Sequence, residues 1–119
     1  MSAADFPRVD EQEFERLAAA IHGDGDEPGG QIAEIRSEIE DIYELSPLQQ
    51  GLLVEYLAQP DAGVYLIQTD ATFDAEITAE ELRRAWLSIL ERHDILRTEF
   101  YWEGLSEPLQ VVRSNVEVP

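Results

Sequence analysis

Side chains that commonly perform catalysis are few in this sequence. It has two histidines, His22 and His93, and no cysteine. The missing cysteine excludes a disulfide scaffold, a thiol nucleophile and Cys-ligated zinc or iron–sulfur sites. Each histidine lies at the end of a predicted helix, where the helix dipole favours a cation, so we interpret both as structural rather than catalytic.

Carboxylates are abundant, but they form no catalytic or metal-binding pattern. Asp24, Asp26 and Glu27 resemble part of a calcium-binding loop, yet the further acids and the closing glutamate of such a loop are missing. The sequence also has no nucleophile elbow, zinc-protease, dinucleotide-binding or phosphate-loop motif. We therefore expect no metal site and no directly bound cofactor, and the residues alone reveal no complete active site.

The charge balance excludes two classes of partner. The 119 residues carry 26 acidic and eight basic side chains, a formal net charge of −18. Such a surface repels phosphate backbones and anionic lipids, which argues against nucleic acid and membrane partners. Because the sequence also has no long apolar run and no secretory signal, we expect a cytoplasmic domain with a solvated acidic surface.

The length of the chain suits one domain, and the distribution of acidic residues separates a leader from that domain. We predict an acidic leader, residues 1–37, and a domain, residues 38–119. The glycine-rich and acidic residues 22–30 predict a flexible linker inside the leader.

The leader is also predicted to hold a helix over about residues 10–22. Asp10 would cap it, with Glu13 as the reciprocal acid at the third helical position.

Four isoleucines follow the linker at alternating spacings of three and four residues. They are Ile32, Ile35, Ile39 and Ile42. This is heptad spacing over fewer than two heptads, too short for a coiled coil. Two interpretations stay open: one or two helical turns packed on the domain, which we favour, or a helix whose isoleucine face docks a partner.

Two helices are predicted in the domain from their first residues. Ser46, Pro47 and Gln49 form an N-terminal capping pattern. Thr78 and Glu81 form a second capping box. The apolar side chains that follow this second box are expected to form a buried stripe, made of Leu82, Ala85, Trp86, Ile89 and Leu90.

Strands are predicted between and after these helices. Residues 64–73 are rich in β-branched and aromatic side chains, which is typical of a strand. Residues 97–102 and 109–113 predict a hairpin around Gly104. The order of elements predicts a mixed α/β (α+β) fold.

Three segments resemble the condensation domains of nonribosomal peptide synthetases. Residues 40–53 (EDIYELSPLQQGLL) are similar to the opening of such domains, residues 92–100 (RHDILRTEF) to their second core motif, and residues 101–112 (YWEGLSEPLQVV) to the stretch that follows. Residues 5–7 (DFP) resemble the linker that often precedes such a domain. The resemblance covers about residues 38–118.

The resemblance implies a fold and an activity. The fold would be the N-terminal part of a chloramphenicol-acetyltransferase-like lobe, incomplete in this chain. The intact enzyme would form amide bonds between acyl or peptidyl and aminoacyl thioesters, carried on the phosphopantetheine arms of carrier proteins, in antibiotic or other secondary-metabolite biosynthesis. Carrier proteins and adjacent synthetase domains would be its partners. The family's HHxxxDG motif is absent, so we name no catalytic residue and expect the chain alone to be inactive.

The resemblance also assigns roles to residues of the two motifs. Arg97, with Arg92 as second choice, matches the arginine that pairs with the aspartate of HHxxxDG. Because that partner is absent, we expect Arg97 to be unpaired or to lie at the solvent-facing start of a strand. The other motif residues are interpreted as scaffold: Ser46, Pro47, Gln49 and His93.

Three hypotheses of function follow. The first is an inert piece of a condensation domain. The second is a docking module in which residues 1–44 recruit an upstream part of a synthetase. The third is a self-associating chain, a homodimer formed through exposed strand edges around residues 64–73 and the hairpin. Burial of the isoleucines would argue against docking through them.

Overall fold

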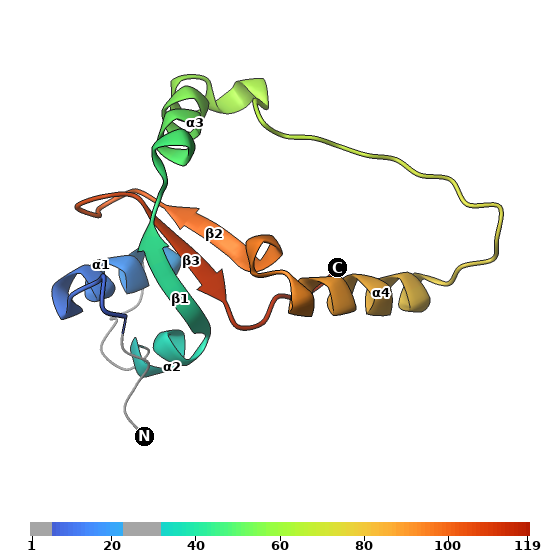
Figure 1. Ribbon diagram of the computed structural model, residues 1–119, viewed down its shortest axis with the longest axis horizontal. Helices are drawn as coiled ribbons and strands as arrows, with labels where there is room; N and C mark the ends of the chain where they lie inside the picture. Colours follow the sequence, from blue (N-terminus) through green and yellow to red (C-terminus); the bar gives the residue numbers. More distant parts are fainter. Residues whose placement is uncertain (1–5, 23–31) are drawn as a thin grey trace.

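The fold is organised around a small antiparallel sheet. In the computed structural model, which describes residues 6–22 and 32–119, three strands pair in the order β1–β3–β2 (Figure 1). The strands are β1 (Ile39–Glu44), β2 (Thr98–Tyr101) and β3 (Leu109–Arg113). The predicted hairpin is confirmed, because β2 and β3 pair antiparallel. β3 lies between the other two strands and is their common hydrogen-bonding partner.

Four α-helices and two 3₁₀ turns accompany this sheet in the described part of the chain. They are α1 (Glu11–His22), α2 (Ile32–Ser37), α3 (Pro47–Ala58), η2 (Pro60–Ala62), α4 (Ala79–Arg92) and η3 (Asp94–Arg97). The predicted mixed helix and strand class is therefore confirmed. The predicted linker falls mostly on residues 23–31, outside the described residues.

The hydrophobic core lies between α1, α2 and the sheet. Its buried residues are Phe6, Phe14, Leu17, Ala18, Ile35, Ile39, Ile42, Leu109 and Val111. Side chains alternate between the two faces along a strand, so Leu109 and Val111 point to the same face of β3. In the register of the sheet Ile42 lies opposite Val111. Residues from both the predicted leader and the predicted domain thus share one core.

The helix predicted over residues 10–22 is confirmed by α1. Asp10 Oδ1 accepts a hydrogen bond from the Glu13 N–H at 2.7 Å, as an N-cap does. The Glu13 carboxylate is not part of the cap. It accepts hydrogen bonds from the Ser106 amide at 2.8 Å and from the Ser106 hydroxyl at 2.9 Å.

The favoured interpretation, helical turns packed on the domain, is confirmed for Ile32 and Ile35 and is wrong for Ile39 and Ile42. Ile32 and Ile35 lie on α2, whereas Ile39 and Ile42 lie on β1. β1 pairs with β3 from end to end, and this tertiary pairing overrides the helical spacing. Ile35, Ile39 and Ile42 are buried and Ile32 packs against them, so the stripe is not an exposed docking face.

The two capping boxes of the domain are confirmed. Ser46 Oγ accepts from the Gln49 N–H at 3.2 Å, and the Ser46 N–H donates to Gln49 Oε1 at 2.8 Å. Thr78 Oγ1 accepts from the Glu81 N–H at 3.1 Å, and the Thr78 N–H donates to Glu81 Oε2 at 3.0 Å. These local bonds determine where α3 and α4 begin.

The strand predicted over residues 64–73 is wrong. Figure 1 shows this stretch within a long extended connection from η2 to α4. No strand of the described chain pairs with it, and an unpaired strand cannot satisfy its backbone groups except with water. Most of its apolar side chains are exposed, including Leu66 at 81% and Ile67 at 87%.

The buried stripe predicted for α4 is also wrong. Leu82, Trp86 and Ile89 are exposed, and no residue of α4 is buried. The spacing of these residues is amphipathic as predicted, but the described chain contains no surface that packs over them. The accessible area of 9304 Å² exceeds the roughly 6,500 Å² expected of a compact protein of this mass. The radius of gyration, 17.1 Å, likewise exceeds the expected value of about 13.5 Å.

Candidate functional site

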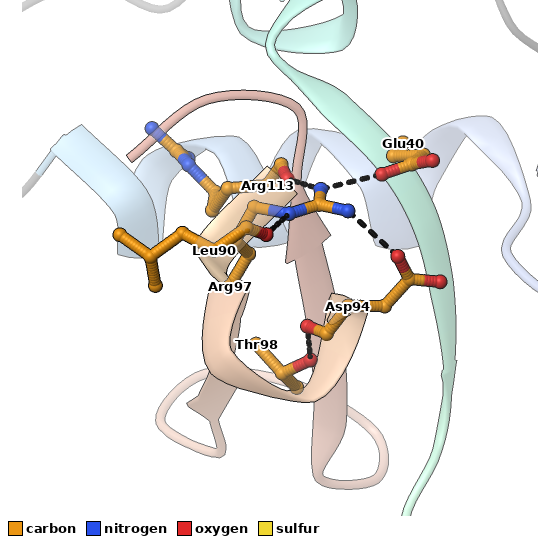
Figure 2. Close-up of polar contacts among 6 residues, drawn as sticks. All are labelled: Glu40, Leu90, Asp94, Arg97, Thr98 and Arg113. Carbon is orange, nitrogen blue, oxygen red and sulfur yellow. Dashed lines mark hydrogen bonds and ion pairs between the residues drawn. The ribbon is translucent and has the colours of Figure 1, made fainter. Parts of the chain in front are cut away.

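Arg97 is the centre of a polar cluster that joins the second motif to the sheet. It is the last residue of η3, and its side chain is only 7% exposed. Nε donates to the Leu90 carbonyl at 2.7 Å, and Nη2 donates to Asp94 Oδ1 at 2.6 Å. Nη1 donates to Glu40 Oε2 at 2.6 Å and also to the Arg113 carbonyl. Figure 2 shows these groups converging on the guanidinium from α4, η3, β1 and β3.

The expectation that Arg97 is unpaired or solvent-facing is therefore wrong. Two carboxylates and two backbone carbonyls of this chain satisfy its donors. The Glu40 and Asp94 side chains are 51% and 66% exposed, so water screens their attraction to the guanidinium. The hydrogen bonds to the two carbonyls also hold the guanidinium in one position. The hydrogen bond with Glu40 is the main cause that raises the pKa of Arg97. A guanidinium held in its charged form cannot transfer protons, so this cluster anchors elements.

Arg92 and His93, the neighbours of Arg97 in the motif, lie outside this cluster. Arg92 is exposed at the end of α4. His93 caps the same helix through its backbone N–H, which donates to the Ile89 carbonyl at 3.1 Å. Sequence reasoning missed Glu40 and Asp94. The spacing of three residues between Asp94 and Arg97 is the one signal that could have found Asp94.

The first motif is tied to the sheet through a second polar cluster. Gln110 lies on β3 with its side chain buried, and its Nε2 donates to Gln49 Oε1 and to the Glu44 carbonyl, both at 3.0 Å. Gln49 Nε2 donates back to Gln110 Oε1 at 3.3 Å. The residue that closes the capping box of α3 therefore also fixes that helix to the central strand. Sequence reasoning missed Gln110, because its partner is 61 residues away.

The structure does not bring the two motifs into one site. Gln110 lies near the start of β3, opposite Tyr43, whereas the Arg97 cluster uses Arg113 at the other end of the strand. His22 is the last residue of α1, far in sequence from both clusters. The scaffold role of the motif residues and the structural role of the histidines remain predictions.

An apolar hollow of about 610 Å³ lies between α3, the segment that follows it and β2. Tyr56 and Trp102 meet edge to face in its wall, with ring centroids 6.3 Å apart. Among the residues that the structure describes, Gln49, Tyr56 and Tyr65 contribute polar side chains to the lining, and no histidine, aspartate or glutamate contributes to it. The hollow can therefore accept apolar groups.

Metal and membrane features are absent from residues 6–22 and 32–119. That part of the chain has no group of three or more His, Asp or Glu side chains arranged to hold a metal ion. None of its helices combines the length and apolar composition that a membrane span requires.

Comparisons with known proteins identify the family. Residues 39–119 match the family described as Condensation domain. The match begins at the first residue of β1 and contains both polar clusters.

The chain is also similar to several long synthetases. It is 53% identical to one of the linear gramicidin synthase proteins of Brevibacillus parabrevis over 81 residues, which are 68% of this chain and 2% of that protein. It is 49% identical to malpinin synthetase of Mortierella alpina over 64% of this chain and 1% of that protein. It is 32% identical to gramicidin S synthase 2 of Brevibacillus brevis over 65% of this chain and 2% of that protein.

The chain thus spans about 2% or less of the length of these curated relatives. The family match covers more than half of the chain, and it coincides with the segments that resemble condensation domains. On this evidence the chain belongs to the condensation domain family of nonribosomal peptide synthetases.

Proposed function

We propose that this chain is the leading part of a condensation domain that forms amide bonds in a nonribosomal peptide synthetase. The observation that carries the proposal is the family match over residues 39–119, supported by relatives that are named as synthases or synthetases. In the reaction, the amine nitrogen of an acceptor aminoacyl thioester bonds to the carbonyl carbon of a donor thioester. The carbon–sulfur bond breaks, and the thiol of the donor carrier leaves with the proton that the amine loses.

The substrates would arrive on phosphopantetheine arms of carrier proteins, and adjacent synthetase domains would be the other partners. The sequence has no HHxxxDG motif, so the group that assists the amine belongs to another part of the enzyme. Within this chain the Arg97 cluster and the Gln49–Gln110 pair position the ends of α4 and α3 on the sheet. We assign this chain a positioning role in a chloramphenicol-acetyltransferase-like lobe.

The exposed apolar faces support the proposal that further parts of the domain cover this chain. Large apolar side chains are exposed from α3 through the connecting segment to α4. We call these side chains together the α3–α4 surface, and they include Leu48, Leu57, Leu66, Ile67, Phe73, Leu82, Trp86 and Ile89. Large exposed apolar areas commonly mark surfaces that another part of a protein or a partner covers. The remainder of a condensation lobe is the partner that the family membership favours.

A graft tests the proposal. The part of the 53% identical linear gramicidin synthase that aligns with residues 39–119 of this chain is replaced by those residues. Mass spectrometry of the carrier-bound product then measures amide formation. We expect a rate within tenfold of the unaltered synthase, because the replaced part supplies scaffold and no proton-transfer group. The isolated chain is expected to form no amide.

Two variants of the graft serve as controls. Arg97→Met is expected to reduce amide formation at least tenfold, whereas Arg84→Met, at an arginine with a 69% exposed side chain, should leave it unchanged. Thioester loading of the neighbouring carrier reports that the rest of the synthase is folded. A graft that loads normally and forms no amide contradicts the proposal.

Self-association is the second candidate, and the α3–α4 surface favours it. The docking alternative through the isoleucines loses its basis because these side chains are buried. Strand-edge pairing through residues 64–73 is not favoured either, since this segment forms no strand. Pairing of two copies through strand edges would have to use β1 or β2, the two edge strands of the sheet.

A further inference from the structure

Two helices outside the family match contribute much of the core. The match begins at residue 39, yet five of the nine residues in the core cluster precede it. These five are Phe6, Phe14, Leu17, Ala18 and Ile35. All are 4% exposed or less, so they are as well buried as the strand residues they contact. The described part of the predicted leader is therefore packed on the matched domain.

The apolar contacts are arranged around Phe14. Its ring stacks on Phe6 with centroids 5.9 Å apart and planes 8° from parallel. The Arg36 guanidinium lies 4.2 Å from the centroid of the same ring, within cation–π range. Arg36 also donates to both carboxylate oxygens of Glu11, at 2.9 and 3.0 Å, which ties α2 to the first turn of α1. The two helices thus form one unit.

A polar contact links this unit to the β2–β3 turn. The Glu13 carboxylate accepts from the Ser106 amide and hydroxyl, 93 residues away in sequence. Arg16 Nη1 donates both to Glu13 Oε2 at 3.0 Å and to Ser106 Oγ at 3.2 Å. The unit is therefore attached to the sheet by an apolar face and by a specific polar contact at its edge.

We propose that the sheet face containing Ile42, Leu109 and Val111 is a docking site for an acidic amphipathic helix, and that residues 6–22 with 32–37 are its occupant in cis. The docked unit fixes Phe6 and the start of α1 relative to the condensation fold. This role is separate from amide formation, and its test requires no activity. Docking rests mainly on apolar burial, because both partners are acidic and repel one another.

Cutting the chain between the two partners tests this role. A protease recognition sequence replaces residues 24–30, and the folded full-length chain is then cut. We expect both pieces to elute together at the mass of the uncut chain at micromolar concentration, and to separate in urea. Retention should strengthen with added salt, which screens the repulsion between the acidic pieces. Pieces that separate without urea overturn the proposal.

Variants locate the contact on the sheet face. Leu17→Asp places a charge in the core and should release the N-terminal piece after cutting. Glu15→Asp, at an exposed position of the same helix, should leave it bound. Equal retention in both variants overturns the proposal.

A milder variant keeps the test decisive if Leu17→Asp prevents folding. Ser106→Ala removes the hydroxyl contacts to Glu13 and Arg16 without touching the core. The dissociation constant of the two pieces should rise about fivefold, as the loss of such contacts does. An unchanged dissociation constant contradicts the contact of Ser106 with Glu13 and Arg16, and with it the docking of α1 beside the β2–β3 turn.

Discussion

Arg97 accounts for how the second motif is held in place. A guanidinium offers several donors in one plane, and this one reaches acceptors on α4, η3, β1 and β3 at once. The carbonyls of Leu90 and Arg113 would each lose a charged donor if the side chain were removed. A lysine could replace the charge but not the planar set of contacts. The residue thus determines how the end of α4 sits against the sheet.

The first prediction concerns removal of this side chain. Arg97→Met should lower the free energy of unfolding by about 2–3 kcal/mol, the value of one or two hydrogen bonds to a charged group. Arg97→Lys should recover less than half of the loss. Urea unfolding followed by circular dichroism measures both. Arg84→Met, at an exposed arginine, should stay within about 0.5 kcal/mol of the parent. Equal losses for Arg97→Met and Arg84→Met would rule out the anchoring role.

The second prediction concerns alkaline pH. Burial, reinforced by the hydrogen bond to Glu99, raises the pKa of the Tyr101 hydroxyl well above its usual value of about 10. The folded chain therefore holds this proton more tightly than the unfolded chain. Its contribution to stability is complete below about pH 10 and is lost as the pH rises further. In Tyr101→Phe the unfolding free energy should decline less steeply above pH 10 than in the parent chain, as urea unfolding at a series of pH values would measure. An identical decline in both chains would contradict the raised pKa of Tyr101.

At the scale of elements, α3 is attached to the sheet chiefly by polar contacts near its first turn. None of its residues is buried. Gln49 closes the capping box and pairs with Gln110 on β3, while Tyr56 meets Trp102 farther along the helix. The direction of α3 therefore depends on a pair of amides in addition to the aromatic contact.

The third prediction tests this attachment. Gln110→Leu keeps the approximate size of the side chain but leaves Gln49 and the Glu44 carbonyl without their partner. We expect faster amide hydrogen exchange throughout α3 and unchanged exchange in α4, with a loss of about 1–2 kcal/mol in stability. Gln68→Leu, at an exposed glutamine, is the matched control. Unchanged exchange in α3 would mean that the amide pair does not position the helix.

Local patterns in the sequence predict some elements and not others, for a physical reason. The caps at Ser46 and Thr78 involve residues three apart, so the helix starts could be predicted. The isoleucine stripe and residues 64–73 could not, because a strand requires a partner strand, which no local pattern specifies. Arg97 was identified by resemblance, but its contact with Glu40 spans 57 residues and no spacing encodes it.

At the scale of the whole molecule, the described chain has a well-packed half and an open half. The sheet with α1 and α2 encloses a core, whereas α3, α4 and the segment between them extend away from it (Figure 1). The exposed apolar faces of these open elements contribute to the excess accessible area. A net charge of −18 keeps copies apart by repulsion.

The fourth prediction concerns self-association, which the exposed apolar side chains favour and the repulsion between acidic copies opposes. Light scattering should report a monomer at low ionic strength and a rising mass as salt screens the repulsion. Leu82→Lys with Ile89→Lys should abolish the rise, because both substitutions interrupt the α3–α4 surface. Arg83→Lys is the control on the same helix. A mass that does not depend on salt, or a rise that survives the double substitution, would show that this surface does not drive association.

Hydrogen exchange of α4 tests whether this chain is a scaffold part that the rest of a condensation domain completes. The exchange of residues 79–92 is measured in the free chain and in the graft within linear gramicidin synthase. We expect at least tenfold slower exchange in the graft, since the exposed face of Leu82, Trp86 and Ile89 would become covered. Equal exchange rates in the free chain and in a soluble graft would contradict it.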